Sequence, residues 1–110
     1  MSGSDIFTGT LELLILRTLR EGDLHGYRIA KHIRDTSQGV LDVEEGALYP
    51  ALHRMERKGL VQSCWGRTDT NRRAKFYSLT PAGSEKLAAD ARRWSSFSDA
   101  VDTVLGPVEG

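Results

Sequence analysis

The chain contains 110 residues, among them 15 basic and 15 acidic ones, so its formal net charge at pH 7 is zero. This length predicts one modest domain with a small core, which favours self-association as a source of further buried surface. Overall neutrality argues against a nucleic-acid-binding protein, because such proteins are usually basic. The charge is unevenly spread, however, since residues 46–75 contain seven basic and two acidic side chains. The middle third therefore predicts one electropositive surface.

The composition also bears on cellular setting. Cys64 is the only cysteine, which excludes an intrachain disulfide or a thiol-based metal site within one chain and favours a reducing compartment. A redox role for Cys64 stays open, although a lone strand thiol is more often a small hydrophobe. No apolar run approaches the roughly 20 residues that span a bilayer, and the first residues lack the regions of a signal peptide. We expect a cytoplasmic protein with no membrane partner.

The first third of the chain predicts two helices. Thr8 or Thr10 is placed to cap a first helix, which should be largely buried because apolar residues surround most of its circumference. Gly22 ends this helix. A second helix is expected to begin near Leu24 or His25. Its inner face should consist of Tyr27, Ile29, Ala30 and Ile33.

The segment from Glu45 to Val61 predicts a third helix, its end and a following strand. A short first strand is expected just before it, at residues 40–43. Leu48, Leu52 and Met55 recur at helical spacing and make a buried stripe. Ala47 to Tyr49 should form the first turn, because Pro50 is placed just inside the helix. The helix is expected to end at Gly59 in a left-handed cap, and its outer face carries Tyr49, His53, Arg54, Arg57 and Lys58.

The part that follows predicts a hairpin. Residues 61–66 and 75–79 alternate between apolar and polar side chains, and the polar stretch 67–73 between them forms the tip. Trp65 is expected to pack against the third or the last helix. Four cations stand against the single acid Asp69, and DNA phosphates are their expected partners, with one arginine a candidate for the minor groove. The alternative is that these charges only keep the hairpin solvated. The four cations are Arg67, Arg72, Arg73 and Lys75.

A long helix is predicted after Thr80, a capping residue, and Pro81. Its residues Leu87, Ala91, Trp94, Ser98, Val101 and Leu105 recur at steps of four and three, which is the spacing of a coiled-coil seam. Such a helix is longer than the body from which it grows and cannot bury its seam alone. We therefore expect a winged-helix domain over residues 1–80 and a dimerisation helix over residues 81–106, in a mainly α fold with a small β-hairpin.

The same order of elements resembles the PadR family of bacterial transcriptional regulators, in the branch with a small C-terminal domain. The resemblance covers all but the two ends of the chain, and the combination of motifs is specific although each alone is weak. The matching residues are L-E-L-L-I-L-R-T-L in the first helix, H-G-Y-R-I at 25–29, E-G-A-L-Y-P-A-L-H-R-M-E-R-K-G-L-V at 45–61 and F-Y-S-L-T-P-A-G at 76–83.

The resemblance implies a sequence-specific, DNA-binding homodimeric repressor of a palindromic operator, released by a small aromatic or hydrophobic molecule. It places the third helix in the major groove, with Gly46 allowing close approach to the DNA backbone. Tyr27 and Tyr49 would bind phosphates, although core packing explains both tyrosines as well. Trp94 and Phe97 are candidate ligand contacts, for which plain interface packing is the alternative. The residues that would face base edges are Ala47, Pro50, His53 and Arg54.

Other function classes are less well supported. The histidines, His25, His32 and His53, lack the spacing of a zinc site, and no phosphate-binding glycine loop is present. We therefore expect no enzyme activity, metal or cofactor. The main alternative is a winged-helix protein that uses its third helix and hairpin for protein contacts without binding DNA.

Overall fold

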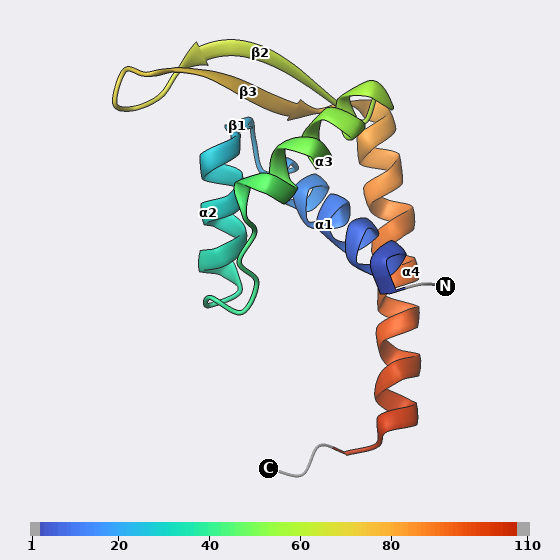
Figure 1. Cartoon of the computed structure of the whole chain (residues 1–110). Helices are drawn as coiled ribbons and strands as arrows, with labels where there is room; N and C mark the ends of the chain where they lie inside the picture. Colours follow the sequence, from blue (N-terminus) through green and yellow to red (C-terminus); the bar gives the residue numbers. More distant parts are fainter. Residues whose placement is uncertain (1–2, 108–110) are drawn as a thin grey trace.

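The computed structural model describes residues 3–107, with side chains from residue 9 onward. Four helices surround one end of a small sheet, and the last helix extends well beyond the body (Figure 1). None of the helices in residues 3–107 combines the length and apolarity needed to cross a bilayer. The elements in chain order are α1 (Gly3–Leu19), β1 (Leu24–His25), α2 (Gly26–Thr36), α3 (Glu45–Arg57), β2 (Val61–Arg67), β3 (Arg73–Leu79) and α4 (Pro81–Leu105).

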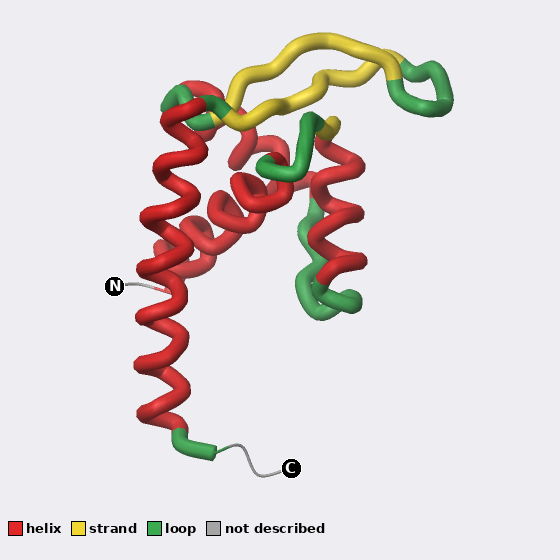
Figure 2. The backbone as a smooth tube through the Cα atoms, turned by 180° about the vertical axis from the view of Figure 1, so that it is seen from behind, coloured by secondary structure: helices red, strands yellow, loops and turns green. Residues whose placement is uncertain are grey.

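Helix α1 lies at the centre of the core. Its apolar residues point in several directions because it contacts α2, α3, α4 and β3, and Figure 2 shows it running obliquely from the middle of α4 toward the sheet. The predicted burial of this helix is confirmed. It begins at Gly3, however, so Thr8 and Thr10 lie inside it and do not cap it. The buried apolar residues that form the core are Leu11, Ile15, Leu16, Leu19, Ile29, Ile33, Leu48, Ala51, Leu52, Met55, Leu60, Val61, Tyr77 and Leu87.

Helix α3 shows the predicted stripe. Leu48, Leu52 and Met55 are fully buried, and Gly59 follows the helix with a φ of 75°, the left-handed conformation that favours glycine. The helix begins at Glu45, earlier than expected, so Pro50 lies inside it. Its missing N–H removes one hydrogen bond on the outer side of the helix. The fully buried inner face outweighs that loss and keeps the segment helical.

The sheet has three strands in the order β1-β3-β2. Strands β2 and β3 form the predicted hairpin, in antiparallel register from Val61 opposite Leu79 to Arg67 opposite Arg73. Strand β1 was not predicted; it pairs Leu24 with Tyr77 and His25 with Phe76. Two residues are too short to show an alternating pattern, so β1 exists only because β3 offers it a partner.

Two expectations in the α2 region are wrong. Residues 40–43 form no strand; the turn after α2 is instead closed by Ser37, whose Oγ accepts a hydrogen bond of 3.0 Å from the N–H of Leu41. Tyr27 does not belong to the inner face of α2, because it is 60% exposed. Gly26, which begins the helix, is buried in its place together with Ile29 and Ile33.

The start of α4 is joined to the end of α3, and the predicted Thr80 cap is confirmed. The Thr80 hydroxyl accepts a hydrogen bond from the Gly83 N–H at 3.0 Å and donates one of 2.6 Å to the Gly59 carbonyl. The Thr80 N–H also donates to the Leu60 carbonyl at 3.2 Å. A Cβ on Gly83 would lie 2.1 Å from that Leu60 oxygen, so only glycine permits this approach.

The contact at Gly83 predicts a large effect of one methyl group. Gly83→Ala should lower the free energy of unfolding by about 2–3 kcal/mol, because the Leu60 backbone cannot move away cheaply. Gly9→Ala is the matched control, since nothing lies within 4 Å of its Cβ position, and it should raise stability by about 0.5–1 kcal/mol. Urea unfolding at one fixed protein concentration measures both. Equal stability of Gly83→Ala and the wild type would contradict this packing.

Candidate nucleic-acid interface

The outward face of α3 is exposed and carries polar and cationic side chains. Gly46, Pro50, His53 and Arg57 are all exposed, and their spacing of four, three and four residues places them on one side of the helix. This side is opposite the buried stripe. Ala47 is exposed on one flank and Tyr49 on the other. Small residues toward the start of this face leave its backbone open to close approach, while hydrogen-bonding side chains follow toward its end.

The structure places the two arginines of α3 differently from the expectation. The Nε atom of Arg54 lies 3.7 Å from Oε2 of Glu12 on α1, with 34% of the side chain exposed. Arg54 therefore points along the edge of the helix toward α1. Arg57 is exposed and makes no ion pair within residues 9–107. The sequence analysis named Arg54 rather than Arg57 for base contacts, although the spacing of Arg57 from His53 and Pro50 places it on the outward face.

Tyr49 and the start of α2 are in close contact. A Cβ on Gly26 would lie 2.7 Å from both Cε1 and the hydroxyl of Tyr49, so the glycine of the H-G-Y motif makes room for this ring. Tyr49 is still 38% exposed. Burial, and secondarily the charge of Glu45, raises the pKa of Tyr49 above its usual value. Its hydroxyl keeps its proton at neutral pH and is available as a donor.

A groove of about 500 Å³ separates the start of α2 from the tip of the hairpin. The first turn of α2 contains no acidic residue, and the groove is lined by three arginines and a single aspartate. Burial, followed by the charge of Arg28, lowers the pKa of His25, while Asp69 acts in the opposite direction; the ring is thus neutral at pH 7. The lining residues are His25, Tyr27, Arg28, Thr68, Asp69, Thr70, Arg72, Arg73 and Ala74.

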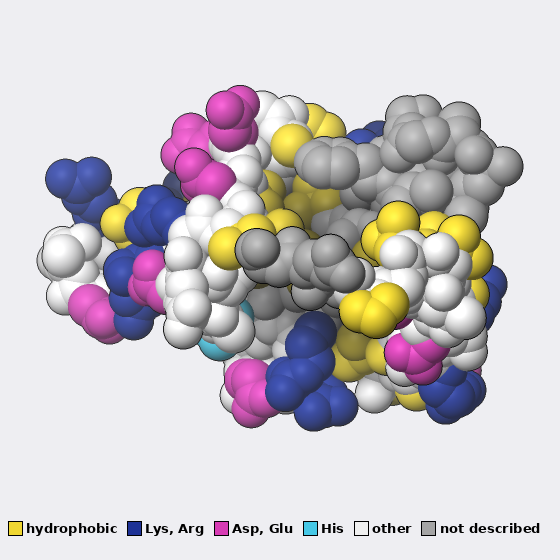
Figure 3. All heavy atoms as spheres, turned by 90° about the horizontal axis from the view of Figure 1, so that it is seen from below, with side chains coloured by type: hydrophobic (Ala, Val, Ile, Leu, Met, Phe, Trp, Pro, Cys, Tyr) yellow, Lys and Arg dark blue, Asp and Glu magenta, His cyan; other side chains and the backbone are white. Residues whose placement is uncertain are grey.

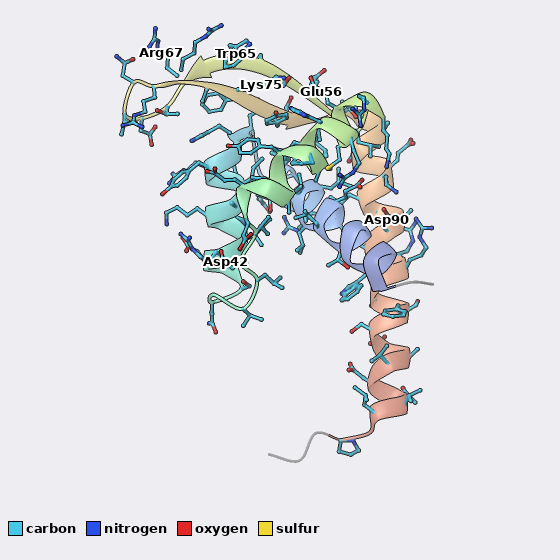
Figure 4. All side chains as sticks on the ribbon, viewed as in Figure 1. Asp42, Glu56, Trp65, Arg67, Lys75 and Asp90 are labelled. Carbon is cyan, nitrogen blue, oxygen red and sulfur yellow. The ribbon has the colours of Figure 1, made fainter. Side chains whose placement is uncertain are left out.

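The hairpin carries its cations far from the helices. In Figure 4, Trp65 and Arg67 lie on the projecting part of the hairpin. Trp65 does not pack against α3 or α4; it is 58% exposed. Its ring instead contacts the guanidinium of Arg73, whose Cζ lies 4.3 Å from the ring centroid. This cation–π contact fixes the direction of Arg73. Arg67 and Arg72 are exposed beside it.

Glu56 connects α3 with both strands of the hairpin. Its Oε2 accepts a hydrogen bond of 2.6 Å from the Ser63 hydroxyl on β2, and its Oε1 lies 3.6 Å from Nζ of Lys75 on β3. In Figure 4, Glu56 lies near the end of α3 and Lys75 on the neighbouring stretch of the hairpin. Of the four hairpin cations named from the sequence, Lys75 is therefore the one already paired within the protein.

The far half of α4 exposes an apolar strip. Trp94, Phe97, Val101, Val104 and Leu105 are all at least partly exposed, and four of them, with Ala100 in place of Trp94, line a shallow groove of about 270 Å³. The Trp94 and Phe97 ring centroids lie 5.9 Å apart. Figure 3 shows apolar side chains at the near end of α4 and the cationic hairpin on the opposite side of the molecule.

Leu87 and Ala91, the first two residues of the expected seam, differ in exposure. Leu87 is only 4% exposed and belongs to the core of its own chain, so it is not available to a partner. Ala91 is exposed. The free strip of α4 therefore begins one turn later than the sequence pattern suggests, because the first turns of α4 already pack on α1 and β3.

The exposed thiol of Cys64 lies on β2. Within residues 9–107, no group of three or more histidine, cysteine, aspartate or glutamate side chains is arranged to hold a metal ion.

A core of three helices, a capped outward-facing third helix and a projecting antiparallel hairpin define a winged-helix protein. The chain belongs to the transcriptional regulator PadR-like family, whose model matches residues 15–89, and it is a transcriptional regulator. A solved transcriptional regulator from Clostridium thermocellum has the same fold, with a TM-score of 0.83, 29% sequence identity and coverage of 93% of this chain and 99% of that chain.

Two relatives of known class support the same assignment. The transcriptional regulator Rv3488 of Mycobacterium tuberculosis is 34% identical over 82 residues, which are 74% of this chain and 73% of that protein. The negative transcriptional regulator PadR of Bacillus subtilis is 27% identical over 77 residues, which are 70% of this chain and 42% of the relative.

The attachment of the hairpin through Glu56 is testable by stability. Ser63→Ala should lower the free energy of unfolding by about 1 kcal/mol, because it leaves the Glu56 carboxylate without its hydrogen-bond donor. Ser78→Ala is the matched control, since Ser78 lies on the opposite face of the same sheet and its hydroxyl makes no hydrogen bond within residues 9–107. Urea unfolding compares the two; equal effects would show that the Ser63 bond does not contribute.

Proposed function

We propose that this regulator is a homodimeric repressor that binds a palindromic operator in double-stranded DNA through α3, the hairpin and the start of α2. The observation that carries the proposal is the set of arginines on these elements that have no acidic partner within residues 9–107. They are Arg28 on α2, Arg57 on α3 and Arg67, Arg72 and Arg73 on the hairpin. Unpaired, exposed arginines are the groups that phosphates and guanine edges attract most strongly.

Helix α3 is the element proposed for the major groove. Gly46, Ala47 and Pro50 allow its backbone to approach the DNA, and small side chains of this kind contact thymine methyl groups. His53 and Arg57 follow on the same face and supply hydrogen bonds to purine edges. Arg57 replaces Arg54 in this role, because Arg54 is drawn toward Glu12.

The phosphate contacts are proposed to surround α3. Tyr49 packs against Gly26 and Tyr27 follows Gly26 in the chain. Their hydroxyls donate to the DNA backbone, where they fix the register of α3. On the hairpin, Arg67 and Arg72 reach phosphates. Arg73, held by the Trp65 ring, is the candidate for a narrow minor groove. Lys75 contributes mainly to the attachment of the hairpin to α3, through Glu56.

The apolar strip of α4 is proposed to pack against a second copy of the chain. Trp94, Val101 and Leu105 are exposed on α4, whose far half extends beyond the body (Figure 1), and Ala91 borders them. A two-fold pair brings two α3 helices to one face, where they would read half-sites roughly 34 Å apart. Negative regulation by the Bacillus subtilis relative supports repression.

The same strip supports a proposal for release. Trp94 and Phe97 are neighbouring exposed aromatic rings, and their flat faces suit a small aromatic or hydrophobic molecule. A ligand held there at the dimer interface would change how the two protomers are set relative to one another. That change moves the two α3 helices away from the half-site spacing and weakens operator binding.

DNA binding is tested by electrophoretic mobility shift with a duplex taken from upstream of the protein's own gene. Arg57→Ala should weaken binding to this duplex by about 1–3 kcal/mol and relax preference at one base position. Arg73→Ala should weaken all duplexes similarly and lower the salt slope by about 1.

Arg92→Ala is the control for this experiment, because Arg92 is exposed on α4, outside the proposed interface. It should bind as the wild type does. No shift by the wild-type protein even at low salt, where phosphate contacts are strongest, would favour the alternative of a protein-interaction module. If Arg92→Ala lowered the affinity for the duplex as much as Arg57→Ala does, the binding would be non-specific electrostatic attraction.

Dimerisation is tested by placing a charge in the strip. Val101→Asp should give monomers by light scattering and abolish operator binding, because a carboxylate cannot be buried without a partner. Ser96→Asp adds the same charge on the other side of α4 and should remain dimeric. A Val101→Asp protein that is still dimeric would place the interface on another surface.

A further inference from the structure

Glu12 is a buried carboxylate on α1 that the proposed function does not use. Its side chain is only 8% exposed, and each of its two oxygens faces one cation of the α3 C-terminal region. Oε2 lies 3.7 Å from Nε of Arg54, and Oε1 lies 3.7 Å from Nζ of Lys58. One buried negative charge is thus shared by two positive charges from the helix proposed to bind DNA.

The contacts to Glu12 act through charge rather than through directional bonds. Both distances exceed that of a normal hydrogen bond, and Nε of Arg54 is buried with no hydrogen-bond partner among the described side chains. Arg54 and Lys58 also keep 34% and 56% of their side chains exposed. Both cations therefore have an open path to solvent, and the attraction of Glu12 is what keeps them turned toward α1.

We infer that Glu12 is a specificity-determining residue, which acts by withholding Arg54 and Lys58 from the phosphate backbone of DNA. The inference rests on the proposed function. A buried carboxylate that loses its counter-charges is strongly unfavourable, so DNA phosphates compete poorly for these two cations. Among the three cations near the end of α3, only Arg57 then reaches the DNA.

This arrangement lowers the sequence-independent affinity for DNA and leaves the contacts to base edges unchanged. Each phosphate neutralised by the protein adds to non-specific binding and steepens its salt dependence. What matters for a regulator is the ratio between operator binding and the many competing sites. A restrained pair of cations raises that ratio, because the contacts that would favour every sequence equally are removed.

The test uses Glu12→Gln in the full chain, which keeps the shape of the side chain and removes its charge. Binding to the upstream duplex and to an unrelated duplex is measured over a range of salt concentrations. Glu12→Gln should bind the unrelated duplex more tightly than the wild type. Its salt slope should steepen by about 1 for each cation that newly reaches a phosphate. The operator-to-unrelated ratio should fall.

Two further variants separate this role from a purely structural one. Adding Arg54→Met and Lys58→Met to Glu12→Gln should return the salt slope to the wild-type value, whereas a general loosening of the fold would not be reversed in this way. Lys58→Met alone, in the wild-type background, should leave the slope unchanged. This single variant keeps Arg54 beside Glu12 and tests the inference even if Glu12→Gln folds poorly.

The outcomes distinguish the two proposals. If the wild type binds the upstream duplex and Glu12→Gln shows an unchanged slope and ratio, the inference about Glu12 is overturned and the proposed function stands. A slope that falls by about 1 in Lys58→Met also overturns it, because Lys58 would then already contact phosphate. If the wild type binds no duplex at low salt, both proposals fall.

Discussion

The burial of the inner face of α3 is the constraint on which the rest of the molecule depends. Leu48, Ala51, Leu52 and Met55 are completely enclosed, so this helix cannot rotate without exposing its stripe to water. Its outward face is thereby fixed. Gly59 then ends the helix, and the hydrogen bond from Thr80 to the Gly59 carbonyl brings the start of α4 to the same point. The orientation of the hairpin and of α4 follows from one packed helix and its cap.

Two acidic residues pair with some of the cations near α3 and the hairpin and leave others without an acidic partner. Glu12 holds Arg54 and Lys58 near α1, and Glu56 holds Lys75 toward α3. Arg57 and the three hairpin arginines have no acidic partner within residues 9–107. A chain whose formal charge is zero thus presents a cationic surface over α3 and the hairpin. Overall neutrality is consistent with DNA binding once local pairing is taken into account.

The features predicted well from the sequence are those with a local signal. The stripe of α3, the glycine cap at Gly59, the Thr80 cap and the hairpin each follow from spacing, backbone conformation or turn chemistry within a few residues. Strand β1 was missed because two residues carry no period. The start of α1 was misplaced because the threonines chosen as caps also fit inside a helix.

The positions of single side chains in the candidate site needed the tertiary structure. Arg54 and Arg57 were both expected on the outer face, and the approach of Glu12 from a distant helix turns Arg54 toward α1. Trp65 has the alternation of a packed strand residue, but it is 58% exposed and contacts the guanidinium of Arg73. Leu87 fits the seam spacing, but it is buried in the core of its own chain, where α4 packs on α1. Each difference arises from contacts between elements far apart in the chain.

The central claim is that α3 and the hairpin recognise a specific two-fold DNA sequence. The most direct measurement is selection of bound duplexes from a random-sequence pool by the full chain, followed by sequencing. We expect enrichment of a palindrome whose half-sites lie about one helical turn apart, and we expect this enrichment to be lost when Arg57 is replaced by alanine. Binding without any enriched sequence, or enrichment of an asymmetric single site, would contradict it.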